Sequence, residues 1–161
     1  MRKSIIFVII AGFGVAQLSI ADFFKVFGVK PDLLLICVVF ASLNFNLRWA
    51  LIFSVFAGVF KDVFSANTFG LNTLLFALWS FLIVRLAREI SIDDEILRAI
   101  LILAAVALHN IICGLVFIYC GKFIPPGIIV RIVLIESVYT ALVSPLVFRC
   151  FRPAYLRVQA I

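Results

Sequence analysis

Long apolar runs separated by short polar turns dominate the sequence. The first run, from about residue 4 to residue 24, is long enough to cross a bilayer, because a spanning helix needs about 20 mainly apolar residues. Hydrophobic residues make up 66% of the 161 positions and charged residues only 14%. A water-soluble fold of this size could not bury so much apolar surface. We therefore predict an integral membrane protein whose solvent is the bilayer.

Six such runs predict a bundle of six transmembrane helices. Together they form one all-α polytopic membrane domain over residues 1–161. The expected helices span residues 4–24, 32–43, 48–64, 71–84, 96–119 and 128–148, and the second is short for a span. The first run follows Arg2 and Lys3 as in a signal peptide, but its length and the lack of a small-residue cleavage site favour a retained helix. The charge-dense segment 85–98 is expected to be a surface loop, in which a short amphipathic helix is also compatible with the sequence.

Lysine and arginine residues are distributed unequally between the two sides of this arrangement. Six spans place both termini on one side, which collects nine of the Lys and Arg residues, and five lie on the other side or at membrane depth. Cytoplasmic loops carry the excess of basic residues, so both termini are predicted to be cytoplasmic. The net charge of +6 is then explained by orientation and by contact with lipid headgroups, and no nucleic-acid partner is expected.

Polar residues inside the predicted helices are candidate sites, because an ionisable group in hydrocarbon is costly unless it is paired or hydrated. Gly58, Asp62 and Ser65 share one helical face, and Gly58 would let another helix approach closely. Two interpretations of Asp62 remain open. It either fixes the turn between the third and fourth helices by a contact or cap, or it simply lies at the membrane interface beside Lys61.

Other polar residues are given mainly structural interpretations. Pro31 and Asp32 suit the start of a helix, where an acidic residue faces the positive end of the helix dipole. Asn72, just after Gly70, can cap the preceding turn or hydrogen-bond to a neighbouring helix. Glu136 begins a polar stripe in the last helix and is interpreted as a satisfied interior carboxylate, with a proton or substrate path as the alternative.

Motifs for catalysis, cofactors or metals are missing from the sequence. The lone histidine, His109, cannot build a multi-histidine zinc site, and it is interpreted as a polar residue packed between helices. HExxH, GxSxG, a Walker A loop and a dinucleotide-binding loop are absent, and the four cysteines lack CxxC spacing. We therefore predict no catalytic, cofactor-binding or metal-binding residues. The residues alone leave two classes open, a membrane scaffold and a small-molecule transporter.

Three motifs in residues 28–84 resemble the rod shape-determining protein MreD family. They are VKPDLLLI at 29–36, GVFKDVFS at 58–65 and FGLN at 69–72, in the order and spacing typical of that family. The sequence departs from the family pattern at Thr68-Phe69, where Pro-Leu is usual, and at Lys61, where an apolar residue is usual. A further departure is Trp79-Ser80-Phe81 in place of a common Gly-Tyr.

The resemblance implies a non-catalytic component of the bacterial cell-elongation machinery in the cytoplasmic (inner) membrane. Its expected partner is the bitopic membrane protein MreC, and through it MreB filaments would be coupled to the peptidoglycan synthases RodA and penicillin-binding protein 2. The family is also similar in fold to the substrate-binding subunits of energy-coupling-factor vitamin transporters, which makes such a subunit the alternative function. Those subunits carry Ala-x-x-x-Ala in their first helix, whereas this chain has Gly12-x-x-x-Ala16.

Overall fold

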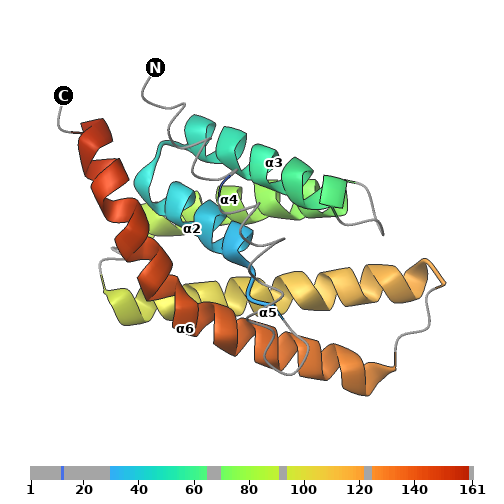
Figure 1. Ribbon diagram of the computed structural model, residues 1–161. Coiled ribbons are helices and arrows are strands. Elements are labelled where there is room, and N and C mark those ends of the chain that lie inside the picture. Colours follow the sequence, from blue (N-terminus) through green and yellow to red (C-terminus); the bar gives the residue numbers. More distant parts are fainter. Residues whose placement is uncertain (1–11, 13–29, 65–69, 91–93, 122–124, 160–161) are drawn as a thin grey trace.

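The computed structural model describes residues 12, 30–64, 70–90, 94–121 and 125–159. The regular structure of these residues is helical, and Figure 1 shows its arrangement. The helices are α2 (Leu33–Asn44), α3 (Leu47–Phe64), α4 (Leu71–Glu89), α5 (Glu95–Tyr119) and α6 (Pro126–Gln159). The helix predicted at residues 4–24 lies outside the described residues, apart from Gly12.

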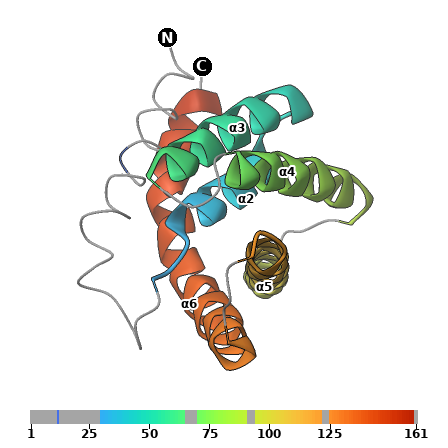
Figure 2. The ribbon, with the colours of Figure 1, turned by 90° about the vertical axis from the view of Figure 1, so that its right-hand side faces the viewer.

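Helix α2 is the centre of the bundle. Nine of its 12 residues are buried, and it contacts each of the other described helices. Figures 1 and 2 show α3 and α4 on one side of α2 and α6 on another. At the end near α6, the Phe40 ring packs on Phe148 and Phe151, with centroid distances of 5.3 and 4.9 Å. A helix that is apolar on all faces belongs in the interior of a bundle, and this explains why a segment that is short for a membrane span is a buried helix here.

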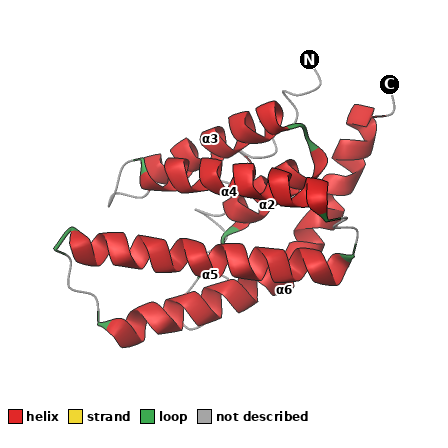
Figure 3. Cartoon of the chain, turned by 180° about the vertical axis from the view of Figure 1, so that it is seen from behind, coloured by secondary structure: helices red, strands yellow, loops and turns green. Residues whose placement is uncertain are grey.

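The other four helices form two antiparallel pairs. Helix α3 packs on α4, and α5 packs on α6, as Figure 3 shows from behind. Helix α2 lies between the two pairs and connects them. The contact between α4 and α5 is much smaller than the contact within either pair. The two pairs therefore meet mainly through α2.

Two helices extend further than the sequence predicted. Helix α4 continues through Glu89 instead of ending at Val84, so the first part of the expected 85–98 loop is helical. Helix α6 continues to Gln159 instead of ending at Phe148. Charged residues mark the end of the apolar segment, but Arg, Leu, Ala and Glu are all good helix formers. A helix that leaves the hydrocarbon can therefore continue in the same direction.

Three of the described helices are long and apolar enough to cross a membrane. They are α4, α5 and residues Gly127–Arg149 of α6, while α2 is a shorter apolar helix. Helix α3 has 18 residues but carries Arg48, Lys61 and Asp62. These helices agree with the predicted membrane protein. That the chain has six spans remains a prediction.

Candidate functional site

Asp62 connects the end of α3 to the start of α4. Its Oδ1 accepts hydrogen bonds from the backbone N–H and the side-chain amide of Asn72, at 3.1 and 2.8 Å. Its Oδ2 accepts from the backbone N–H and the hydroxyl of Thr73, at 2.9 and 2.6 Å. The first N–H groups of a helix have no partner within that helix, and a carboxylate at this end also interacts favourably with the helix dipole. Of the two interpretations of Asp62, the geometry corresponds to the cap.

Two glycines allow this contact to form. A Cβ atom added at Gly58, one turn before Asp62, would lie 2.4 Å from Thr73 Cα and 2.9 Å from Thr73 N. Only glycine lets the two backbones approach so closely. Gly70 is the N-cap of α4, has a φ of +93° and has no side chain to cap the helix, so Asp62 provides the cap from α3. Ser65, the third residue of the predicted face, lies outside the described residues.

Asn72 continues the network to α5. Because its side-chain amide nitrogen donates to Asp62, its oxygen faces His109, whose Nε2 lies 3.2 Å away. Nε2 must then carry the proton, since an amide oxygen only accepts. His109 is 1% exposed, its ring lies 5.4 Å from the Phe76 ring, and Cys113 Sγ is 3.6 Å from its Nε2. It therefore occupies a packed position between α4 and α5.

Asp32 connects α2 to both α3 and α6. Its Oδ1 caps α2 by accepting from the Leu35 N–H at 3.1 Å, and its own N–H donates to Thr140 Oγ1 at 3.1 Å. Its Oδ2 accepts from Lys61 Nζ at 2.5 Å. Asp32 is 1% exposed, and the side chain of Lys61 is 20% exposed. Pro31, which precedes it, is also buried. This ion pair binds the start of α2 to the end of α3.

Sequence reasoning did not predict the Asp32–Lys61 ion pair. The two residues are 29 positions apart, and Lys61 was considered as a neighbour of Asp62 and as a departure from the family pattern, but not as a partner of Asp32. Lys61 Nζ also lies 5.1 Å from the centre of the Phe76 ring, a cation–π distance. The available signal was that two opposite charges lie near the ends of neighbouring apolar segments, which the predicted six-span arrangement places on the same side of the membrane. Unpaired, each would be costly there.

Glu136 lies on α6 and is half-buried, while Thr140 and Ser144, one and two turns later, are buried. Thr140 accepts the bond from Asp32, and Ser144 donates to the Ala141 carbonyl of its own helix at 2.7 Å. The polar stripe therefore faces the bundle. Arg131, five residues before Glu136, is exposed.

These contacts form two bonded groups, which meet at the adjacent residues Lys61 and Asp62 and together involve all five described helices. We call them the polar network, and it consists of Asp32, Lys61, Asp62, Asn72, Thr73, His109 and Thr140. Its two carboxylates bind backbone and side-chain donors of neighbouring helices. In the described part of the chain, no three His, Cys, Asp or Glu residues are grouped in a way that could hold a metal ion. The network is thus suited to fixing the positions of helices.

Fold and network together define a class, a helical membrane protein whose buried polar groups bind one another. Comparison with family models gives a match to the family described as rod shape-determining protein MreD, over residues 1–152. The chain belongs to the MreD family. This family has a role in determining rod shape and is not known as an enzyme family. No curated protein and no solved structure matches the chain, so the likeness to transporter subunits remains a prediction.

Proposed function

We propose that the chain is a non-catalytic scaffold of the bacterial cell-elongation machinery in the inner membrane. It binds an MreC-like bitopic protein. Through that protein it helps to couple MreB filaments to RodA and penicillin-binding protein 2. The observation that carries this proposal is the family match over residues 1–152.

The polar network supports a scaffold in physical terms. Between apolar helices in a bilayer there is little hydrophobic driving force, because lipid chains are as apolar as leucine. Hydrogen bonds and close packing must therefore select one arrangement of the helices. The four bonds to Asp62, the close approach at Gly58 and the Asp32–Lys61 pair are contacts of this kind. A fixed arrangement gives a partner helix a constant surface to bind.

The proposed membrane arrangement has six spans and cytoplasmic termini. In this arrangement the Asp62 cap and the start of α2 lie near the outer surface. The connection between α4 and α5 lies near the cytoplasmic surface, as do Arg85 and Arg88. Accumulation of arginine at that connection supports the assignment.

The test is an affinity purification of the tagged chain from mild detergent, followed by mass spectrometry of the proteins that copurify. We expect an MreC-like protein together with elongation synthases. Recovery of a coupling-factor membrane subunit with its ATPases, and no elongation protein, would overturn the proposal in favour of a transporter subunit.

A matched pair of variants makes this test specific. Asp62→Ala removes the cap, and Glu89→Ala removes an exposed carboxylate at the last turn of α4. We expect the first variant to insert into the membrane but to recover less of the partner, and to support rod shape poorly in cells. The second should behave like the unmodified chain. Equal partner recovery and equal cell shape for both variants would mean that the Asp62 cap has no part in the function.

A further inference from the structure

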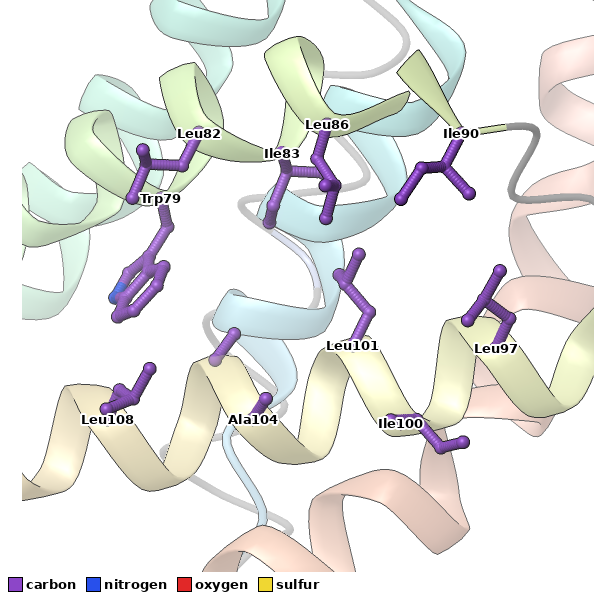
Figure 4. A pocket seen from close by; sticks show the side chains of 11 residues that line it. Trp79, Leu82, Ile83, Leu86, Ile90, Leu97, Ile100, Leu101, Ala104 and Leu108 are labelled. Atoms are coloured by element: carbon purple, nitrogen blue, oxygen red, sulfur yellow. The ribbon is translucent and has the colours of Figure 1, made fainter. Parts of the chain in front are cut away.

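A groove between α4 and α5 lies apart from the polar network. Its volume is about 270 Å³, and apolar side chains line it. Figure 4 shows Trp79, Ile83 and Leu86 of α4 pointing toward Leu101 and Leu108 of α5. The inner wall is formed by buried residues, among them Trp79 and Ile83. Nothing in the polar network uses this space.

The rim of the groove is open to the surroundings of the bundle. Leu82 and Leu86 are 45% and 40% exposed, and Ile100 and Leu108 on the facing helix are 57% and 48% exposed. Both helices are long and apolar enough to cross a membrane, and in a bilayer these exposed side chains would face hydrocarbon. An empty apolar space forfeits dispersion contacts on its walls. An apolar occupant from the bilayer is therefore favoured.

The groove has the length of one leaflet. Its lining extends along α4 from Trp79 to Ile90, about 16 Å at a rise of 1.5 Å per residue. The hydrocarbon core is about 30 Å thick, so the groove covers roughly half of it. Trp79 lies at one end of the groove, near the middle of α4. Ile90 and Leu97 lie at the other end, beside the α4–α5 connection, and we call this the connection end.

The volume fits a single hydrocarbon chain. A cavity of about 150 Å³ holds one benzene molecule, and the same proportion gives about eleven carbon atoms in the groove.

The connection end of the groove has charges of both signs. Arg85, Arg88 and Glu89 are exposed on the last turns of α4, and Asp94 and Glu95 are exposed just before Leu97. A phosphate would be attracted by the arginines and an ammonium group by the carboxylates. Because both signs are present, the pattern is complementary to a zwitterionic headgroup, and the three carboxylates would repel a headgroup with net negative charge.

We propose that the α4–α5 groove binds one acyl chain of a zwitterionic phospholipid from the leaflet that borders the α4–α5 connection. The lipid fills the space that α4 and α5 leave between them and becomes part of the surface of the protein. This proposal is independent of the partner protein and of the role in cell shape.

Trp79 offers a direct probe of this proposal. The chain has two tryptophans, so Trp49→Phe leaves Trp79 as the only one. The variant is placed in vesicles of equimolar phosphatidylcholine and phosphatidylglycerol, with brominated chains on one lipid and then on the other. Bromine quenches indole fluorescence on contact. We expect stronger quenching when phosphatidylcholine carries the bromine.

Two further substitutions test whether the chain lies in the groove. Ala104→Phe, on the Trp49→Phe background, fills the groove from an exposed position, and Leu103→Phe adds a ring at an adjacent exposed position outside it. We expect Ala104→Phe to lose most of the preferential quenching and Leu103→Phe to retain it. Native mass spectrometry should likewise show one retained phospholipid per chain, lost only in Ala104→Phe.

Other outcomes would overturn the proposal. Stronger quenching by phosphatidylglycerol would refute the zwitterionic headgroup. Equal quenching by both lipids in all variants would mean ordinary bilayer contact. Absence of quenching and of retained lipid would mean that protein fills the groove.

Discussion

Removing the Asp62 carboxylate should destabilise the packing of α4 on α3 more than any other single truncation of an acidic residue. Asp62→Ala deletes four hydrogen bonds and leaves the donors of Asn72 and Thr73 without that partner. Interhelical hydrogen bonds in membrane proteins contribute about 0.6 kcal/mol each on average, which gives about 2.4 kcal/mol for four. Bonds to a charged group are roughly twice as strong, which gives an upper value of about 5 kcal/mol.

We expect a loss of about 3 kcal/mol in the free energy of unfolding. This loss lies toward the lower end of the range of about 2.4 to 5 kcal/mol because the four bonds share one carboxylate. Water near the membrane surface can also reach a helix end and replace part of the lost bonding. Asp62→Asn retains one acceptor oxygen but places an amide group against a second set of donors. It should therefore fall between Asp62→Ala and the unmodified chain.

The assay is reversible unfolding in mixed micelles, followed by circular dichroism during titration with a denaturing detergent. Glu89→Ala is the control, because Glu89 is exposed and its truncation should change the free energy by less than about 0.5 kcal/mol. An Asp62→Ala variant as stable as this control would refute the reasoning, since the cap would then contribute nothing measurable.

Three further predictions concern the same region and the membrane orientation. Gly58→Ala should cost about 1–3 kcal/mol in the same titration, because its Cβ meets the backbone of α4, and an unchanged stability would show that α4 can shift freely. Lys61→Met should cost up to about 3 kcal/mol by leaving Asp32 buried without its counter-charge, and adding Asp32→Asn should recover part of the loss; no recovery would argue against the ion pair. Cys120 is exposed, and the proposed orientation places it outside the cytoplasm. In a Cys150→Ser background it should therefore react with a membrane-impermeant maleimide that is added outside the cell. Reaction only after permeabilisation would reverse the proposed orientation.

The membrane character and the family could be predicted from the sequence, and both are confirmed by the helices and the family match. Each long apolar segment was expected to be a helix, because a backbone in hydrocarbon must satisfy its own hydrogen bonds and a helix does so within one segment. The Asp62–Asn72 contact was also within reach of sequence reasoning. The two residues are 10 positions apart on either side of a turn, so their helices must be neighbours.

Contacts between distant segments could not be predicted in this way. Asp32 and Thr140 are 108 positions apart, and their bond depends on where α6 crosses α2. Hydropathy identifies which residues avoid water but not which apolar faces meet in a bilayer, because every such face is equally compatible with lipid. The helix ends at Glu89 and Gln159 were missed for a related reason, since hydropathy marks the edge of the membrane rather than the end of a helix.

The two ends of the bundle are held together by different kinds of contact. Asp32, Lys61 and Asp62 lie where α2 begins and α3 ends, so one end of the bundle is held by directional bonds. At the other end α4 and α5 separate around an apolar groove. Directional bonds lose strength steeply with displacement, whereas apolar contacts in lipid can be exchanged for lipid contacts at little cost. Loss of the bonded end should therefore leave helices that still insert but no longer hold one arrangement, whereas filling the groove should change only what the bundle binds from the bilayer.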